Sequence, residues 1–210
     1  MKYFIVPAMI AENQKELNKE LSIAAKFSSR IQIDVMDGKF VPTHSNDFNF
    51  KLKKFPYYEA HLMIEEPLSW IKKHGKKVNC IIIHYESTKQ IKNCIKEIKR
   101  IKKEAGIAIN PETPISKIKE FLSEIDRVQI MTVYPGYYGA KFLPWTLKKV
   151  NQIRKISPNI NIEVDGGIND RTILQALHAG ANIFGAGSFV MKNNNPKKAY
   201  ITLLTRLKKS

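Results

Sequence analysis

The sequence predicts an α/β protein with the (β/α)8 TIM barrel fold, and three features favour it. Its 210 residues are 43% hydrophobic, which is enough to bury one sizeable core. No linker or low-complexity tract divides the chain, so residues 1–210 are expected to form a single domain. Short apolar segments alternate with helical patterns, and such alternation is typical of a parallel sheet. An open doubly wound sheet is the alternative.

Eight short apolar segments are predicted as strands because they are bounded by turn or helix signals. They are Tyr3–Pro7, Ile31–Val35, Tyr58–Met63, Asn79–His84, Ala105–Ile109, Arg127–Met131, Asn161–Val164 and Asn182–Gly185. Between them, Ser87 followed by Gln90 has the spacing of a capping box and predicts a helix start. Thr113 followed by Pro114 predicts another, since proline is common at the first helical position.

The segment after the seventh predicted strand has well-defined helix boundaries. Asn169 precedes an apolar stripe at helical spacing and is predicted to start the helix. Gly180 follows the stripe and is predicted to cap its carboxyl end. Eight repeats of a strand and a helix without a spare element fit a TIM barrel near the short end of its size range.

Charge and apolar patterning bear on partners and location. The net charge is +16, but the densest lysine run, Lys89 to Lys103, interleaves with isoleucines at helical spacing. This pattern indicates a solvated helix face, so a nucleic-acid-binding role is the least favoured alternative. The apolar segment Tyr3–Ile10 is more typical of a strand than of a signal peptide, and no run is long enough to span a membrane. Cys80 and Cys94 lack pairing or metal spacing, which favours the cytoplasm.

Carboxylates stand at the ends of two predicted strands. Asp34 lies in the second strand and Asp165 directly follows the seventh. Active sites of TIM barrels lie at the carboxyl ends of the strands, where His61 and Met131 are also expected. Two facing carboxylates can move protons on both sides of one small molecule. The structural alternative for both aspartates is a role in turns or helix caps.

Strand alternation predicts which polar side chains share a side of the sheet. Gln32 and Asp34 are two residues apart and should point the same way, as should His61 and Met63. Glu163 precedes Asp165 by two residues and is expected to make a buried polar contact inside the barrel.

Glycines follow the last two predicted strands, where barrels commonly bind phosphate. Gly166 and Gly167 come after the seventh strand, and Gly187 and Ser188 come after the eighth. Backbone amides in such loops can hold a phosphate, and glycine lets the backbone approach a ligand closely. Tight turns without a ligand are the alternative reading.

Several motifs, taken together in this order and spacing, resemble those of the ribulose-phosphate 3-epimerase family. They are Asp34-Val-Met-Asp-Gly-Lys-Phe-Val-Pro42, His61-Leu-Met63, Met131-Thr-Val-Tyr-Pro-Gly136 with Gly139-Ala-Lys-Phe142, and Glu163-Val-Asp-Gly-Gly167. The resemblance extends from Pro7 to the Ala186-Gly-Ser188 turn. It implies a barrel of the ribulose-phosphate-binding type that interconverts D-ribulose 5-phosphate and D-xylulose 5-phosphate, with a small phosphorylated ketose as substrate.

The resemblance also implies roles for the polar residues. In the family, aspartates at the positions of Asp34 and Asp165 are the acid and base that exchange the proton at C3. A divalent metal ion, such as zinc, iron, manganese or cobalt, is held by these carboxylates and two histidines, one of which matches His61. The ion stabilises an enediolate intermediate, because a proton next to a carbonyl group is only weakly acidic.

Methionines and a loop complete the site that the resemblance implies. Methionines that match Met36, Met63 and Met131 line the planar intermediate, although ordinary core packing is equally compatible with their chemistry. Gly136 and Gly139 match the family's mobile loop over the phosphate. Members of the family often form homo-oligomers, so a homo-oligomer is a possible state here.

The chain departs from the family pattern at several positions. Gln32 stands where the family has its first metal-binding histidine, and Ala8 stands where it has a serine. An amide oxygen is a weaker zinc ligand than imidazole, so the preferred ion shifts toward harder cations or the metal is lost. The segment 43–48 also differs, and Tyr134 and Tyr138 replace an asparagine and a glycine. An epimerase for another pentulose or hexulose phosphate, or a phosphosugar-binding barrel without turnover, therefore stays open.

Two further histidines have ambiguous roles in the sequence. His44 lies in a polar loop that could fold over the barrel mouth, but an exposed loop histidine is the favoured reading. His84 ends the fourth predicted strand beside Glu86, where it could line the cavity or serve as a structural histidine.

Overall fold

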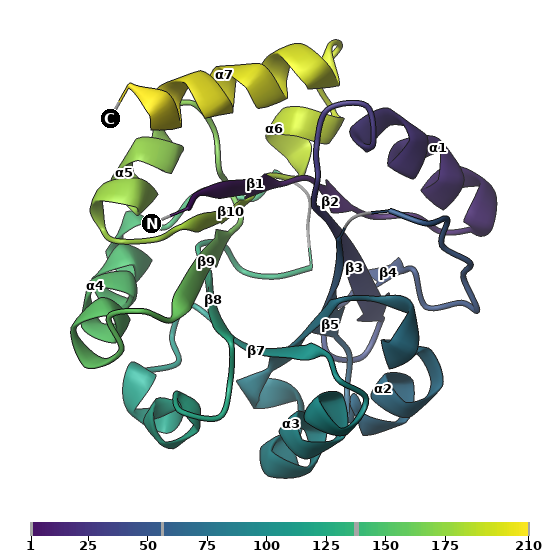
Figure 1. Ribbon diagram of the computed structural model, residues 1–210, viewed down its shortest axis with the longest axis vertical. Coiled ribbons are helices and arrows are strands. Elements are labelled where there is room, and N and C mark those ends of the chain that lie inside the picture. Colours follow the sequence, from purple (N-terminus) through teal and green to yellow (C-terminus); the bar gives the residue numbers. More distant parts are fainter. Residues whose placement is uncertain (1, 56, 137–138, 210) are drawn as a thin grey trace.

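The computed structural model describes residues 2–55, 57–136 and 139–209, and it shows a ring of strands surrounded by helices (Figure 1). Within these residues the sheet has ten strands. Neighbours around the ring run parallel, and the short strand β4, His44–Ser45, pairs antiparallel with the end of β3. The ring strands are β1 (Phe4–Val6), β2 (Ala8–Met9), β3 (Ile31–Asp37), β5 (Tyr58–Met63), β6 (Cys80–His84), β7 (Glu104–Ile109), β8 (Arg127–Met131), β9 (Asn161–Asp165) and β10 (Ile183–Gly185).

The barrel closes through the first predicted strand, which continues past Pro7 in two parts. Strand β1 pairs with β10, and β2 pairs with β3. Pro7 lies between the two parts, and its carbonyl oxygen accepts a hydrogen bond of 2.9 Å from the backbone N–H of Gln32. Because proline has no N–H to donate, it suits the point where the strand changes partners. Closure confirms the predicted barrel and excludes the open sheet.

Helices cover the outer face of the ring (Figure 1). The first helix begins after Asn13, whose side chain accepts a hydrogen bond of 3.0 Å from the N–H of Glu16. The α-helices are α1 (Gln14–Ala24), α2 (Leu68–His74), α3 (Ile91–Arg100), α4 (Leu147–Ile156), α5 (Thr172–His178), α6 (Ser188–Met191) and α7 (Pro196–Lys208). The 3-10 turns are η1 (Gly75–Lys77), η2 (Tyr85–Ser87), η3 (Ile115–Lys117), η4 (Lys119–Phe121) and η5 (Pro144–Thr146).

Two predicted helix starts are wrong. Ser87 ends the 3-10 turn η2, where its hydroxyl donates to the carbonyl of His84, and α3 begins only at Ile91. After Pro114 the chain forms the 3-10 turns η3 and η4 instead of an α-helix. The buried residues of that segment, Ile115, Ile118 and Phe121, recur every three positions, which matches the period of a 3-10 turn.

The predicted carboxyl end of α5 is confirmed, whereas the helix begins at Thr172, two residues later than the predicted cap at Asn169 implies. The side chain of Asn169 accepts hydrogen bonds of 2.9 and 3.0 Å from the N–H groups of Arg171 and Thr172, at the start of the helix. At the other end, Gly180 adopts a φ of 104° and donates its N–H to the carbonyl of Leu177. This left-handed conformation favours glycine and stops the helix.

A buried ion cluster fills the barrel interior below the carboxyl ends of the strands. The Nη1 atom of Arg127 lies 2.5 Å from Glu59 Oε2 and 2.6 Å from Glu163 Oε2, and all three side chains are fully buried. The predicted buried contact of Glu163 is therefore confirmed. Burial and the neighbouring charge of Glu59 raise the pKa of Glu163 well above its ordinary value.

The surface and the thiols agree with the sequence. Helix α3 buries Ile91, Ile95 and Ile98 and exposes its lysines, as expected for a solvated face. Cys80 and Cys94 are buried and free. Among the described residues, no helix combines the length and apolar character needed to cross a membrane.

Candidate active site

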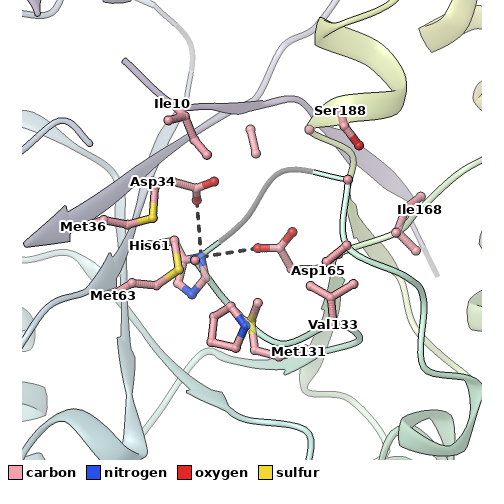
Figure 2. A pocket seen from close by; sticks show the side chains of 18 residues that line it. Ile10, Asp34, Met36, His61, Met63, Met131, Val133, Asp165, Ile168 and Ser188 are labelled. Atoms are coloured by element: carbon pink, nitrogen blue, oxygen red, sulfur yellow. Dashed lines mark hydrogen bonds and ion pairs between the residues drawn. The ribbon is translucent and has the colours of Figure 1, made fainter. Parts of the chain in front are cut away.

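A cavity opens at the carboxyl ends of the barrel strands (Figure 2). The barrel brings side chains and loops from β3, β5, β8 and β9 and from the turn after β10 to this one place. Of the predicted site residues, those that line the cavity are Asp34, Met36, His61, Met63, Met131, Gly136, Gly139, Asp165, Gly166, Gly167, Gly187 and Ser188. Gln32 is fully buried and does not line the cavity.

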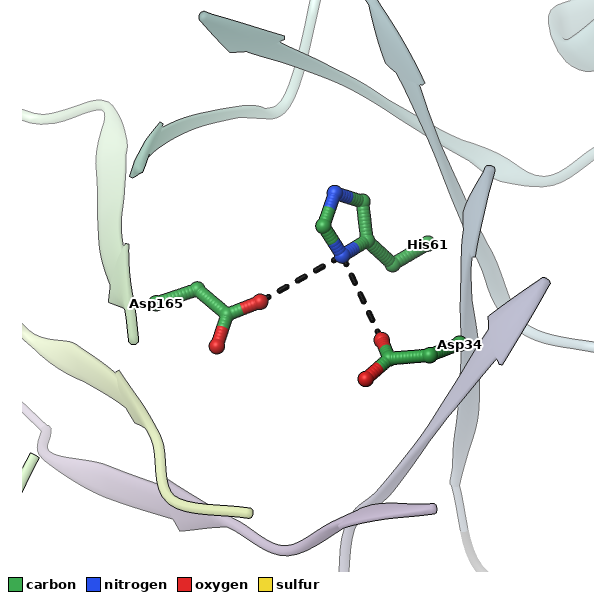
Figure 3. A group of neighbouring side chains, drawn as sticks. All are labelled: Asp34, His61 and Asp165. Atoms are coloured by element: carbon green, nitrogen blue, oxygen red, sulfur yellow. Dashed lines mark hydrogen bonds and ion pairs between the residues drawn. The ribbon is translucent and has the colours of Figure 1, made fainter. Parts of the chain in front are cut away.

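Two carboxyl groups point toward the same ring nitrogen of one imidazole (Figure 3). The Nδ1 atom of His61 lies 3.3 Å from Asp34 Oδ1 and 3.3 Å from Asp165 Oδ2. Burial alone would lower the pKa of His61, but hydrogen bonds and attraction to both carboxylates raise it to about 10. In this structure the imidazole is therefore the cation that holds the two acidic groups together.

The two aspartates have different electrostatic environments. Burial raises the pKa of Asp34, and the nearby charge of Asp165 raises it further. Burial also acts to raise the pKa of Asp165, but the hydrogen bond and the charge of His61 outweigh it and lower that pKa. Paired carboxyl groups with opposite shifts suit an acid and a base in one reaction.

Gln32 touches both aspartates through its amide nitrogen. Its Nε2 atom donates hydrogen bonds of 2.8 Å to Asp34 Oδ1 and 3.0 Å to Asp165 Oδ2. Its Oε1 atom is buried and has no hydrogen-bond partner among the described residues. The predicted common direction of Gln32 and Asp34 is thus confirmed, and an unsatisfied oxygen remains beside the carboxylates.

Gln129 is a site residue that the sequence analysis missed. It lies on β8, fully buried, and its Nε2 atom lies 3.1 Å from Asp165 Oδ2 and 3.1 Å from His61 Nε2. A signal was available, because Gln129 is a polar residue in an apolar strand, two positions before the cavity-lining Met131. Alternation therefore places its side chain inside the barrel.

His84 does not line the cavity but lies behind His61. It is fully buried, and its Nε2 atom lies 2.8 Å from His61 Nε2. Burial holds the pKa of His84 below its ordinary value. Burial alone would raise the pKa of Glu86, but hydrogen bonds from His84, Thr113 and the backbone of Asn110 lower it.

The loops after β9 require glycine for steric reasons. Gly166 has a φ of 107°, and a Cβ atom there would lie 2.3 Å from Val133 Cγ2. Gly167 has a φ of 66°, and its Cβ would lie 2.9 Å from the Cβ of Phe142. These positions expose backbone to the cavity, so they are compatible with both a tight turn and a phosphate-binding loop.

Methionines form an apolar part of the cavity wall (Figure 2). Met36, Met63 and Met131 are all buried, and Met36 and Met63 pack together with Val41. These side chains face the two carboxyl groups without offering strong hydrogen-bond partners.

The departures from the family pattern have different surroundings. Ala8 lines the cavity, whereas the side chain of Tyr134 is exposed, and Tyr138 lies outside the described residues. His44 is exposed on β4 and does not line the cavity, so it does not replace the missing histidine. In the same segment, Asn46 donates a hydrogen bond of 2.9 Å to the carbonyl of Asp34 and supports β3 from outside the cavity.

Comparison with known proteins connects this cavity to one family. The model of the ribulose-phosphate 3-epimerase family matches residues 4–191. The chain belongs to the ribulose-phosphate 3-epimerase family. It is 34% identical over 205 residues to the ribulose-phosphate 3-epimerase of Schizosaccharomyces pombe, covering 92% of this chain and 89% of the relative. It is 32% identical over 206 residues to the Bacillus subtilis enzyme of the same name, covering 93% of this chain and 95% of the relative.

Solved structures of other members of the fold support the architecture. A 3-hexulose-6-phosphate synthase from Salmonella typhimurium has a TM-score of 0.73 at 13% identity, with 98% of this chain and 99% of that chain covered. A 3-keto-L-gulonate-6-phosphate decarboxylase from Vibrio cholerae has a TM-score of 0.72 at 13% identity, with 100% and 99% covered. At this level of identity the likeness shows the fold alone.

Proposed function

We propose that this protein is a 3-epimerase of a ketose phosphate and interconverts D-ribulose 5-phosphate and D-xylulose 5-phosphate. The observation that carries the proposal is the pair of carboxyl groups, Asp34 and Asp165, held 3.3 Å from one imidazole atom in a single cavity. The two groups come from strands far apart in the chain and face each other (Figure 3). Such a pair can reach both faces of a planar carbon.

The reaction requires one carboxylate and one carboxylic acid. The ionised aspartate removes the proton from C3, and the electrons of the broken C–H bond form a double bond between C3 and C2 while the π electrons of the C2 carbonyl move to its oxygen. The C2 carbonyl then re-forms, and the C2–C3 double bond takes the proton of the protonated aspartate on the opposite face of C3, which inverts the configuration. At the end the two aspartates have exchanged protonation states, so the reverse reaction uses the same groups in opposite roles.

The residues present fit a divalent metal ion. Asp34, His61 and Asp165 each offer a ligand atom, these atoms lie within 4.8 Å of one another, and all three residues are buried. The unpartnered Oε1 of Gln32 would become a fourth donor if its amide turned by 180°. Carboxylate, imidazole and amide ligands suit zinc, iron, manganese or cobalt. When bound, the ion supplies Lewis-acid stabilisation of the negative charge that develops on the substrate.

The remaining lining residues bind and shield the substrate in this proposal. The phosphate lies against the loops that carry Gly136, Gly139, Gly166, Gly167, Gly187 and Ser188. Met36, Met63 and Met131 cover the planar intermediate and exclude water, which would otherwise protonate it from either face. The single-domain organisation, the cytoplasmic location and a homo-oligomeric state stay predictions from the sequence.

Two departures favour a second candidate, a phosphosugar-binding barrel without turnover. Ala8 brings no hydroxyl group to the cavity, and Gln32 presents its amide nitrogen to the carboxylates. An epimerase that acts on another pentulose or a hexulose phosphate would share the same carboxyl pair. Exchange chemistry and binding must therefore be measured separately.

Proton exchange tests the proposal. Metal-stripped protein is incubated with D-ribulose 5-phosphate in deuterated water, with and without zinc, manganese, iron(II) or cobalt, and C3 is followed by NMR. We expect deuterium at C3 together with D-xylulose 5-phosphate, and we expect added metal to increase the rate. Binding of the sugar phosphate without exchange under every metal condition would support the barrel without turnover. Deuterium exchange at C3 of a hexulose phosphate, but not of D-ribulose 5-phosphate, would indicate that the substrate is the hexulose phosphate.

A further inference from the structure

A chain of side chains runs from His61 through the barrel wall to an open groove. The Nε2 atom of His61 lies 2.8 Å from His84 Nε2, at the end of β6. The other ring nitrogen of His84, Nδ1, lies 3.4 Å from Glu86 Oε2 in η2. Glu86 Oε1 accepts hydrogen bonds from the backbone N–H of Asn110, at 2.9 Å, and from the hydroxyl of Thr113. Glu86 also lines the groove.

The chemistry of these groups fixes the direction of each hydrogen bond. An ionised carboxylate can only accept hydrogen bonds. His84 must therefore carry a proton on Nδ1 and donate it in a hydrogen bond to Glu86 Oε2. A neutral imidazole with its proton on Nδ1 accepts at Nε2. His84 Nε2 therefore accepts from His61 Nε2, so His61 keeps a proton on that nitrogen whether or not its Nδ1 is also protonated. The Nδ1 atom of His61 is the one that faces the two aspartates.

The surroundings leave His84 as the acceptor for His61 Nε2. Both rings are fully buried and nearly parallel, with centroids 4.9 Å apart and planes at 21°. The Nε2 atom of Gln129 is also 3.1 Å from His61 Nε2, but an amide nitrogen donates and cannot accept. The same Gln129 atom lies within hydrogen-bond distance of Asp165 Oδ2, at 3.1 Å, Met131 Sδ, at 3.5 Å, and His61 Nδ1, at 3.2 Å.

We propose that His84 and Glu86 are positioning residues that fix the tautomer of His61, so that its Nδ1 lone pair is available to a divalent metal ion. The inference rests on the proposed metal site and adds two residues that neither touch the substrate nor line the cavity. Residues that hydrogen-bond to a metal-binding histidine orient its ring and set its tautomer, and their loss typically weakens metal binding about 10–100-fold.

Glu86→Gln reverses the direction of the hydrogen bonds that connect residue 86 to His61, while it keeps the shape of the side chain. The amide oxygen can still accept from Asn110 and Thr113, so the amide nitrogen would face His84 and donate to its Nδ1. His84 would then carry its proton on Nε2 and donate it to His61 Nε2. The proton of a neutral His61 would move to Nδ1, where it competes directly with the metal ion.

Zinc affinity tests the inference without relying on activity. Metal-stripped wild-type protein and Glu86→Gln compete for zinc against a chromophoric chelator, and we expect the variant to bind about 10–100-fold more weakly. Glu120→Gln is the matched control, because Glu120 lines the same groove but pairs with the exposed Lys92, and its affinity should equal that of the wild type. Equal losses in both variants would indicate a general charge effect and would overturn the inference.

A second variant and an NMR measurement distinguish a changed tautomer of His61 from misfolding of the first variant. His84→Phe keeps an aromatic ring next to His61 but removes the acceptor, so zinc affinity should also fall. In the zinc-loaded wild-type protein, nitrogen-15 NMR should show His61 protonated on Nε2 and His84 protonated on Nδ1. Wild-type affinity in both variants, or the opposite tautomers, would overturn the inference. Failure of the wild-type protein to bind zinc would instead contradict the proposed metal site on which the inference depends.

Discussion

Two layers of the barrel interior have a similar arrangement, two buried carboxyl groups around one cation. In the upper layer Asp34 and Asp165 surround His61, and in the lower layer Glu59 and Glu163 surround Arg127. Strands β5 and β9 contribute to both layers, because Glu59 and His61, like Glu163 and Asp165, are two residues apart.

The two layers differ in the cation and in access to the cavity. Arg127 cannot lose its proton in a protein, and its layer is fully buried with no residue on the cavity wall. His61 can lose its proton to make room for a metal ion, and both aspartates of its layer line the cavity. A similar arrangement of groups therefore has a structural role in one layer and can carry out chemistry in the other.

The largest effect should come from breaking the upper layer. We expect Asp165→Asn to lower the rate of exchange at C3 by about 10²–10⁴-fold, because an amide can neither remove nor deliver the proton. NMR in deuterated water measures the rate. Asp170→Asn is the control, since Asp170 is partly exposed and pairs with Arg206 outside the cavity. An unchanged rate in Asp165→Asn would exclude Asp165 as a catalytic group.

Breaking the lower layer should affect stability instead. Arg127→Met leaves two buried carboxyl groups without their cation, and we expect a loss of about 3–5 kcal/mol in the free energy of unfolding. Urea titration measures the loss. Combining Arg127→Met with Glu59→Gln and Glu163→Gln should restore part of it, because the unpaired charges are then removed. A single variant as stable as the wild type would contradict the role assigned to this layer.

Gln32→His adds a second imidazole to the upper layer and tests whether residue 32 occupies a ligand position. Imidazole is a better zinc ligand than an amide oxygen, so we expect zinc affinity to rise about tenfold, which corresponds to roughly 1.4 kcal/mol. The exchange rate at C3 at limiting zinc should rise with it. Competition against a chelator measures the affinity. If neither quantity changes, Gln32 does not occupy a ligand position.

A carboxyl group outside both layers should give the smallest effect. Burial raises the pKa of Glu20 on α1 to about 7, and its Oε2 atom has no hydrogen-bond partner among the described residues. A raised carboxyl pKa means that stability is present at low pH and is lost as the pH rises through about 7.

Glu20→Gln should therefore be more stable than the wild type at pH 8 by about 1 kcal/mol, a value reduced for solvent screening. The difference should vanish near pH 4, where the glutamate is neutral in both the folded and the unfolded state. Urea titrations at the two pH values measure it. A stability difference of the same size at both pH values would contradict the raised pKa of Glu20.

Features that depend on a local sequence pattern could be predicted from the sequence alone. Apolar periodicity located the strands, and the position of Asp34, His61 and Asp165 at strand ends predicted that they would meet. The glycines at 166 and 167 signalled a special backbone, which their positive φ values confirm.

Features that depend on contacts between distant segments could not be predicted in the same way. Alternation indicates that Arg127 and Gln129 point to one side of β8, but only the closed barrel brings them to Glu163 and Asp165. The hydrogen bond between His61 and His84 joins two neighbouring strands at a register that periodicity does not specify. The 3-10 turns after Pro114 form because tertiary burial outweighs a local start signal.

The most direct test of the account follows the origin of the hydrogen on C3 in the first product. D-ribulose 5-phosphate with ordinary hydrogen at C3 is converted in deuterated water, and early product is analysed by NMR before the reverse reaction contributes. Two carboxyl groups on opposite faces predict D-xylulose 5-phosphate that carries deuterium at C3, while the remaining substrate retains hydrogen. Product that retains the substrate's own hydrogen would mean that a single group moves the proton, and it would contradict the central role of the Asp34 and Asp165 pair.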